Sequence, residues 1–281
     1  METGPGPMAR ARQLRAIWDY LPAFRVVAEA EHLPTAARAL HVSASSLSRA
    51  IRIAEDRVGV PLFERTGGRL RLNPAGQALL GSVRIAMRVV DEGLATLAEA
   101  GLVGRVVVAA SADVASWLAT PALARMRERE PGLLGELVGM PAAPAVALRR
   151  GDVDVVIGVS VPAGDDLEVE ALTSMRWALH AARGRRGRVR ELVHVAGAPA
   201  PAQHRLQIAA VVADTAMAAA ACQHGLLAWL PLPLAAMYGL VRVPGPATAL
   251  TTIHAAWRRP VAAHARTEAL LEALRAIARP R

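Results

Sequence analysis

The sequence predicts a chain in three parts: a small N-terminal helical domain ending in a hairpin, one long helix, and a C-terminal α/β domain. Three observations predict this division. Short helical patterns up to residue 58 lead into "PLFERTGGRLRLNP" (61–74), which is typical of a hairpin. A helix with heptad-spaced apolar residues follows. From residue 105 onward, strand and helix patterns alternate.

Composition limits what this chain can bind. It has 281 residues and 53% apolar content, enough for a packed core. All basic side chains are arginine, and the net charge of +9 favours a polyanionic partner such as double-stranded DNA. A GC-rich gene would explain why the chain uses arginine instead of lysine, but it would not explain why the net charge is positive. Cys222 is the only cysteine, so no disulfide within the chain and no cysteine-based zinc site is expected.

Targeting signals are not expected. The first fifteen residues, "METGPGPMARARQLR", contain no apolar segment typical of a signal peptide. No run of about eighteen residues is free of charge and apolar enough to span a bilayer. We therefore expect a cytoplasmic protein with no membrane partner, which is also consistent with the single cysteine.

The N-terminal domain is expected to span residues 14–74, after a disordered lead of residues 1–13. Its helical pattern is interrupted near Leu33-Pro34 and again at residues 41–43. In the hairpin, Gly67-Gly68 supplies the turn because glycine adopts positive φ at little cost. Apolar residues alternate with arginine on its second arm.

The helix after Ser43 has two different faces. Ser43 is suited to cap it, because a serine hydroxyl accepts from the free N–H groups of the first turn. Leu47, Ile51, Ala54 and Val58 form an apolar face, and serine and arginine residues lie on the other. With the short helix before it (35–40), this is a helix-turn-helix pattern, whose second helix inserts its N-terminal end into the DNA major groove.

Hydroxyl and guanidinium groups suit DNA, because serine can donate or accept and arginine can pair with guanine or phosphate. Taken singly, serines near a helix start are usually caps and exposed arginines are usually solvated. The order of helix, turn, helix and basic hairpin favours DNA contact. The candidate DNA-binding residues are Thr35, Ser43, Ala44, Ser45, Ser46, Ser48, Arg49, Arg52, Arg65, Arg69 and Arg71.

A long helix is predicted from Pro74 to about residue 100, with residues 75–101 as the linker between the two domains. Its apolar residues repeat at spacings of 3 and 4, which is typical of a coiled coil and favours a homodimer. Packing on its own domain is the alternative, and Gly81 and Gly93 weaken the helix. The heptad face consists of Leu80, Val83, Met87, Val90, Leu94 and Leu97.

The C-terminal domain is expected to span residues 102–281. "RVVVAA" (105–110), "GELVGM" (135–140) and "DVDVVIGV" (152–159) predict buried strands, and helical patterns separate them. This alternation predicts parallel βαβ units. Less clear strand patterns follow, and "HARTEALLEALRAIA" (264–278) predicts a closing amphipathic helix.

Residues 18–76 resemble the winged helix-turn-helix of LysR-type transcriptional regulators. Looser similarity continues through "GRVVVAAS", "LRRGDVDVVIG" and "CQHGLLAWLP". The matching positions are Ala36, Ala37, Leu40, Val42, Ser43, Leu47, Ser48, Arg49, Ile51, Glu55, Gly59, Val60, Leu62, Phe63, Arg65, Pro74, Ala75 and Gly76.

The resemblance implies a fold and a set of partners. The fold would be a winged helix-turn-helix, a linker helix and a two-lobed α/β effector-binding domain resembling periplasmic solute-binding proteins. Homodimers assembled into homotetramers, a small-molecule effector and RNA polymerase would be the partners. Ala44 and Ala50 replace the family's recognition-helix glutamines, Ser45 its proline, and Asn73 the threonine before Pro74. The chain is short between residues 179 and 225, so we expect a shortened second lobe.

Candidate effector contacts follow from this architecture, in which ligands bind near strand ends and helix N-termini. Ser111, Asp113 and Ser116 follow the first strand of the domain, and Ser160 follows "DVDVVIGV". Asp113 would oppose an anion, and capping of the helix that starts near Val114 is an equally good role for it. The arginine-rich "RGRRGRVR" (183–190) favours a solvated loop over a DNA contact.

No sequence motif indicates catalysis. The chain lacks a G-x-S-x-G, a Walker loop, a G-x-G-x-x-G and histidines at metal-binding spacing, so neither an enzyme, a metal nor a cofactor is expected. Three hypotheses remain: an effector-controlled transcription regulator, a DNA-binding regulator without an effector, and an enzyme or solute-binding protein that uses the α/β domain. The helix-turn-helix and the heptad face speak against the third.

Overall fold

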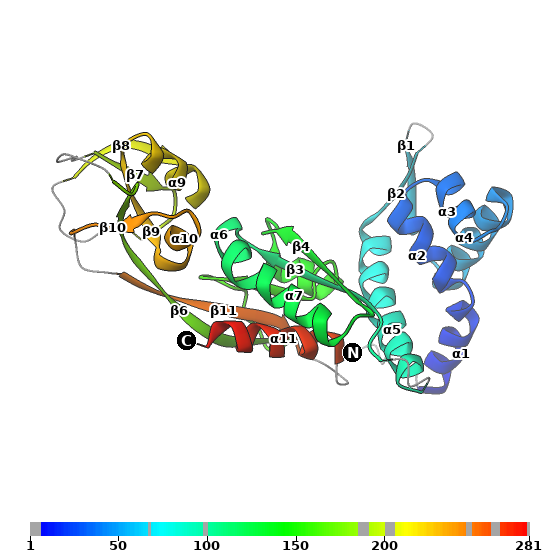
Figure 1. Ribbon diagram of the computed structural model, residues 1–281. Coiled ribbons are helices and arrows are strands. Elements are labelled where there is room, and N and C mark those ends of the chain that lie inside the picture. The colour runs from blue at the N-terminus through cyan, green and yellow to red at the C-terminus, as the bar shows by residue number, and fades with distance from the viewer. Residues whose placement is uncertain are drawn as a thin grey trace. The chain divides into compact units, whose positions relative to one another are not determined.

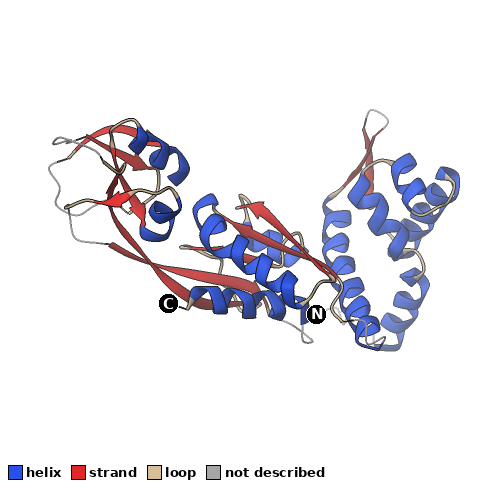
Figure 2. Ribbon diagram, viewed as in Figure 1, coloured by secondary structure: helices blue, strands red, loops and turns tan. Residues whose placement is uncertain are grey.

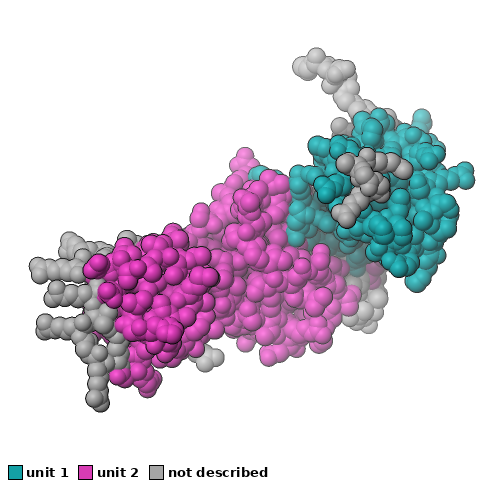
Figure 3. Space-filling view, turned by 90° about the horizontal axis from the view of Figure 1, so that it is seen from above, with its two compact units in different colours: residues 1–91, 149–152 teal, residues 92–148, 153–281 magenta. Residues whose placement is uncertain are grey.

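The structure is a computed structural model that describes residues 7–66, 69–97, 101–184, 191–199, 206–245, 249–259 and 265–279. The chain forms two compact units (Figure 3). The first comprises residues 1–91 with 149–152, and the second comprises residues 92–148 and 153–281. The helices are α1 (Pro7–Trp18), α2 (Leu21–Ala30), α3 (Leu33–Ala39), α4 (Ala44–Val58) and α5 (Pro74–Leu97) in the N-terminal part.

Helix α1 differs from the expected disordered lead. Residues 7–13 are helical, whereas residues 1–6 lie outside the part that the structure describes. The physical reason is composition: methionine, alanine, arginine, glutamine and leucine all favour helix. Ile17, near the end of α1, is buried and anchors this helix to the core of the first unit.

The core of the first unit joins its helices to the hairpin. Strands β1 (Phe63–Thr66) and β2 (Arg69–Leu72) are antiparallel, with Phe63 opposite Leu72. Phe24 of α2 is fully buried and meets Phe63 edge to face, with ring centroids 5.7 Å apart. We call this hairpin the wing, and its position therefore depends on core packing.

The junction between the wing and α5 is fixed by Asn73. Its Nδ2 donates to the Pro61 carbonyl at 2.8 Å, and its Oδ1 accepts from the Gly76 N–H at 2.8 Å. Asn73 thus satisfies one of the free N–H groups of the first turn of α5. Gly76 is needed here, because an added Cβ would lie 2.1 Å from the Leu62 carbonyl oxygen.

The second unit is built on one mixed sheet (Figure 1), with strand order β4-β3-β5-β11-β6-β9-β7-β8 and β10 paired to β6. Its strands are β3 (Gly104–Ala110), β4 (Leu133–Gly139), β5 (Val155–Gly158), β6 (Leu167–Ala181), β7 (Glu191–Val195), β8 (Gln207–Val212), β9 (Leu227–Pro231), β10 (Val241–Arg242) and β11 (Ala249–Arg258). Its helices are α6 (Ala112–Val114), α7 (Thr120–Arg129), α8 (Pro144–Arg150), α9 (Thr215–Gln223), α10 (Leu232–Met237) and α11 (Ala265–Ala278), with a π-helical turn (Ala115–Ala119) joining α6 to α7.

Two long strands connect the lobes of this unit. Strands β4, β3 and β5 are parallel, as the alternating pattern predicts, and form the first lobe with α7 and α11 packed on one face (Figure 2). Strand β11 pairs antiparallel with both β5 and β6, which makes the sheet mixed. The C-terminal half of β6 then pairs with β9, which belongs to the second lobe.

The second lobe has a short connection where a helical crossover is common. Strands β7 and β8 are parallel neighbours, and residues 196–206 join them. The residues of this connection that the structure describes, 196–199 and 206, are not helical. Of the arginine-rich segment 183–190, residues 185–190 lie outside the described part of the chain.

His180 is a buried titratable group in the second lobe. Burial lowers its pKa below the usual value, a backbone hydrogen bond with Ala178 opposes that shift, and the nearby Arg242 adds to it. Arg242 lies directly opposite His180 in the β6–β10 pair, and the thiol of Cys222 lies 3.7 Å from the His180 carbonyl oxygen. The fold therefore favours the neutral imidazole.

Candidate nucleic-acid interface

The N-terminal turn of α4 is held by Ser43. This residue has extended backbone angles, and its Oγ accepts from the Ser46 N–H at 3.0 Å, as an N-cap does. The same Oγ lies 3.0 Å from the Ser45 hydroxyl and 2.8 Å from the Ser46 hydroxyl. The capped turn therefore presents a cluster of hydroxyl groups at a helix N-terminus, where the free N–H groups favour anions such as phosphate.

Burial divides α4 into the two faces that the sequence predicts. Leu47, Ile51 and Ala54 are buried in the core of the first unit. Among the candidate DNA-binding residues, Ser43, Ala44, Ser45, Ser46, Arg49 and Arg52 are exposed and Ser48 is half-buried. Thr35 is exposed at the start of α3, where its Oγ1 lies 2.8 Å from the His32 Nδ1.

The wing carries one candidate arginine whose side chain the structure describes. Arg71, on β2, is exposed, whereas the side chains of Arg65 and Arg69 lie outside the described part of the wing, as does the Gly67-Gly68 turn. An exposed arginine that sequence reasoning missed is Arg38, in the last turn of α3, which donates to the Thr35 hydroxyl at 3.5 Å. The only sequence feature that points to Arg38 as a DNA contact is its position one helical turn after Thr35.

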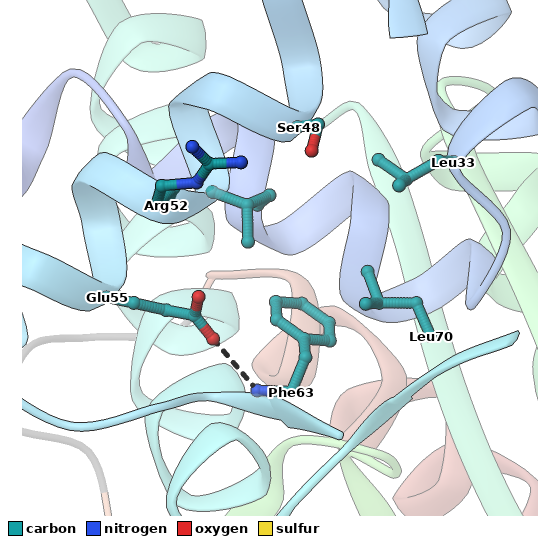
Figure 4. Close-up of a pocket in the computed structure, with 7 residues that line it drawn as sticks. Leu33, Ser48, Arg52, Glu55, Phe63 and Leu70 are labelled. Atoms are coloured by element: carbon teal, nitrogen blue, oxygen red, sulfur yellow. Dashed lines mark hydrogen bonds between the residues drawn. The ribbon is translucent and has the colours of Figure 1, made fainter. Parts of the chain in front are cut away.

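Glu55 connects α4 to the wing, a role that sequence reasoning did not assign. Its Oε1 accepts from the Leu62 backbone N–H at 2.8 Å. It also accepts from the Phe63 backbone N–H at 3.2 Å, the bond drawn in Figure 4. Bonds to a carboxylate are stronger than those between neutral groups. Ser48 and Arg52 lie close by and line a shallow pocket of about 60 Å³ with Phe63 and Leu70, which is too small for an organic ligand.

The heptad face of α5 divides between core and surface. Leu80 and Val83 are buried in the first unit, and Met87 packs against the same core. Val90 is 45% exposed and Leu94 is 59% exposed, whereas the side chain of Leu97 lies outside the described residues. Met87 and Val90 also line a groove of about 320 Å³ between α5 and the start of α2, together with Trp18, Leu21, Pro22, Arg25, Val83, Ala86 and Asp91.

A cleft of about 250 Å³ lies in the second unit between its two lobes. Of the candidate effector residues, Ser111 and Asp113 line it, whereas Ser116 and Ser160 do not. The Ser116 Oγ donates to the Ala112 carbonyl at 2.7 Å, and Ser160 is exposed. Asp113 is not the helix cap, because α6 begins at Ala112 with Ser111 as its N-cap.

Comparison with known proteins decides the family. Residues 18–77 match the model of the bacterial regulatory helix-turn-helix protein, lysR family, and residues 99–199 match the LysR substrate binding domain. A probable hydrogen peroxide-inducible genes activator from Mycobacterium xenopi is 35% identical over 146 residues, which cover 51% of this chain and 77% of that protein. The chain belongs to the LysR family. It is a LysR-type DNA-binding transcriptional regulator.

Other LysR-type relatives match over part of their length. The regulator DgdR from Burkholderia cepacia is 32% identical over 153 residues, which span 53% of this chain and 52% of that protein. The chain thus spans about half the length of several curated relatives that it matches, including TfdS from Cupriavidus pinatubonensis at 52%. The family model of the substrate binding domain ends at residue 199, before α9 and the strands that follow it.

Solved LysR-type structures share the fold. A full-length OxyR variant from Pseudomonas aeruginosa matches with a TM-score of 0.65 at 20% identity, covering 92% of this chain and 98% of that one. LysG from Corynebacterium glutamicum, solved with bound effector Arg, matches at 0.60 and 19% identity, covering 91% and 96%. CbnR in complex with its target DNA matches at 0.54 and 24% identity, covering 93% and 99%.

In the part of this LysR-type chain that the structure describes, none of the helices is long and apolar enough to cross a membrane. Within the same residues, histidine, cysteine and carboxylate side chains form no group that could hold a metal ion.

Proposed function

We propose that this LysR-type protein is a dimeric, ligand-controlled regulator that reads a specific DNA sequence with the first turns of α4. The observation that carries the proposal is the division of α4 into two faces. Its apolar face is buried, and the hydroxyl cluster and two arginines are exposed on the other. Such a helix can insert its N-terminal end into the major groove without uncovering the core.

Arg49 is the residue we assign to sequence reading. It is exposed one turn beyond the hydroxyl cluster, and arginine paired to guanine is the commonest specific contact in the major groove. Ala44 and Ala50 carry no polar group, so they discriminate bases only through apolar contact with the thymine methyl. Arg52 and the wing residue Arg71 are assigned to phosphates, which set position rather than sequence preference.

Substitution of Arg49 by alanine tests this assignment. We expect the variant to lose about 1–3 kcal/mol of affinity for its specific site and to show relaxed preference at one base position. The measurement is fluorescence anisotropy of a labelled duplex from the region upstream of the protein's own gene, with single-base variants, at several salt concentrations.

Arg57→Ala is the matched control, because it removes the same charge from the exposed C-terminal end of the same helix. It should leave base preference unchanged. If Arg49→Ala and Arg57→Ala gave the same isotherms, Arg49 would not read a base. If the parent protein bound no duplex in a salt-dependent manner, the assignment of α4 to DNA would fail altogether.

Dimerisation through α5 is the second part of the proposal. Leu80 and Val83 are already covered within one chain, so among the heptad residues whose side chains the structure describes, the exposed Val90 and Leu94 are available to a partner. Exposed apolar side chains at heptad spacing beside an apolar groove are suited to a second copy of the same helix. Two paired α4 helices would then read two half-sites.

Val90→Asp and Leu94→Asp are expected to weaken the dimer by about 1.5–3 kcal/mol each, the value of one buried aliphatic side chain. Sedimentation velocity over a concentration series measures this directly. Val89→Asp is the matched control, because Val89 is 37% exposed but lies outside the heptad positions. Equal dissociation constants for all three variants would place the dimer interface elsewhere.

Ligand control is the third part of the proposal, and the cleft of about 250 Å³ between the lobes supports it. The alternative is a regulator without an effector, which the short β7–β8 connection would favour. The LysG structure, whose effector is Arg, shows a fold of this kind with a ligand bound. The two alternatives differ in one measurable property, since only a ligand-controlled protein changes its DNA affinity when the cleft is filled.

A further inference from the structure

The walls of the cleft in the second unit, as far as the structure describes them, carry two acidic side chains and no basic one. Asp113 and Asp214 both line it, one from each lobe. The other lining residues that the structure describes are neutral: Ser111, Ala112, Val159, Trp177, Val195, Ala196, Gly197, Ala198, Pro199, Ala213, Thr215 and Thr251. A carboxylate ligand would therefore meet two like charges there and no arginine or histidine from the described lining.

The two carboxylates belong to helix starts that lie against each other. Asp113 is in the first turn of α6, which continues through the π-helical turn into α7, and Asp214 is the N-cap of α9. Helices α6 and α9 are in contact. The Oδ1 of Asp214 accepts from the Met217 N–H at 2.8 Å, and this bond uses one of its two carboxylate oxygens.

The sign of the electrostatic field in the cleft depends on whether the helix-terminus charges or the carboxylate charges are larger. A helix N-terminus is equivalent to about +0.5 of an elementary charge, so two of them contribute about +1. Two carboxylates contribute about −2 elementary charges. Over the part of the lining that the structure describes, the sum stays negative, which favours a cation and disfavours an anion. Helix N-termini alone would have favoured an anion.

Two polar side chains of the cleft wall, Trp177 and Thr251, are paired with each other. The Trp177 Nε1 donates to the Thr251 Oγ1 at 2.9 Å, and the Thr251 hydroxyl donates to the Met175 carbonyl at 3.4 Å. The surface offered to a ligand then consists of the Ser111 hydroxyl, the two carboxylates and the apolar surface of residues such as Val159 and Pro199. A volume of about 250 Å³ is below the usual range for drug-sized ligands, so the ligand is small.

We infer that this cleft binds a small organic ammonium ion, with its cationic nitrogen between Asp113 and Asp214 and its hydrocarbon part on the apolar wall. The inference rests on the proposed ligand control, because it names the chemical class of ligand for the same cleft. A charge-assisted bond to each carboxylate would hold the nitrogen, and would tie the two lobes together through one ligand.

Matched sets of probes test the charge preference on the full-length protein. Each set carries one hydrocarbon with three head groups: butylamine, pentanamide and pentanoate form one, and 2-phenylethylamine, 3-phenylpropanamide and 3-phenylpropanoate form another. We expect at least one amine to raise the melting temperature and to bind by isothermal titration calorimetry, because a ligand of the native state stabilises it. Its amide and carboxylate counterparts are expected to bind at least tenfold more weakly.

Three asparagine variants locate the binding. Asp113→Asn and Asp214→Asn each remove one charge, and asparagine still caps a helix, so the start of α9 is preserved. Each is expected to raise the dissociation constant of the amine at least tenfold. Asp165→Asn, in an exposed turn outside the cleft, should change nothing. Failure of every amine to bind, tighter binding of a carboxylate, or amine binding that both cleft variants retain would overturn the inference.

DNA binding measured in the same samples separates this inference from the proposed function. If an amine binds through Asp113 and Asp214 but leaves DNA affinity unchanged, the ligand class stands and ligand control fails. If the protein binds DNA but no amine, the inference fails and the assignment of α4 stands. If neither DNA nor an amine binds, both fail.

Discussion

Phe24→Ala is expected to lower the free energy of unfolding of the first unit by about 3–5 kcal/mol. The Phe24 side chain is fully buried and meets Phe63 of the wing edge to face. Its truncation removes apolar burial, leaves a cavity between α2 and the wing, and breaks the aromatic pair. Urea unfolding followed by circular dichroism should show the loss as an earlier transition of this unit, together with loss of DNA binding.

Phe24→Leu and Trp18→Ala are the controls for that result. Leucine keeps most of the buried volume and should cost less than alanine does. Trp18 is 48% exposed, so its truncation removes a large aromatic residue without opening a core cavity. An unfolding transition of Phe24→Ala that coincided with that of the parent protein would show that the Phe24–Phe63 contact does not hold the wing in place.

The first unit could be predicted from the sequence because its signals are local. The spacing of Leu47, Ile51 and Ala54 places them on one face of α4, and Ser43 provides the cap within the same short stretch. The fixed turn before the helix is equally local: His41 adopts positive φ, and the Val42 N–H donates to the Ala37 carbonyl. The role of Glu55 could not be predicted from the sequence, because its partners are backbone N–H groups and these leave no pattern of side chains.

The second unit was only partly predictable because its sheet order depends on distant pairings. The parallel strands β3, β4 and β5 follow from alternating patterns. Strand β11 does not: it lies between β5 and β6, although about seventy residues of chain separate it from β6 and about ninety separate it from β5. Its burial alternates only over the first half of the strand, and nothing local in the sequence selects its neighbours.

The cleft shows the same limit for a binding site. Ser111 and Asp113 could be proposed from the sequence because they follow a strand, which is a local rule. Asp214 and Thr251 reach the same cleft from other segments, and this juxtaposition exists only after the lobes have formed. Ser160 satisfies the same local rule but stays outside the cleft, where Val159 takes the lining position.

Glu55→Ala is expected to destabilise the first unit by about 2–6 kcal/mol, because two backbone N–H groups in a partly buried place lose their acceptor and each such loss costs about 1–3 kcal/mol. The effect on DNA binding should exceed the effect on folding. Leu62 and Phe63 start the wing, so without Glu55 the wing is no longer fixed relative to α4. Urea unfolding measures the first effect, and anisotropy at a temperature where the variant is folded measures the second.

Glu55→Gln separates the hydrogen bond from the charge, because glutamine keeps an acceptor oxygen at the same distance along the side chain. We expect it to recover most of the stability and most of the DNA affinity. If Glu55→Gln were as weak as Glu55→Ala, the negative charge itself would matter, and the carboxylate would act on the nearby Arg52 that lines the same small pocket. If both variants bound DNA like the parent protein, the wing would not need a fixed position relative to α4, and the base contacts of α4 would have to provide the affinity by themselves.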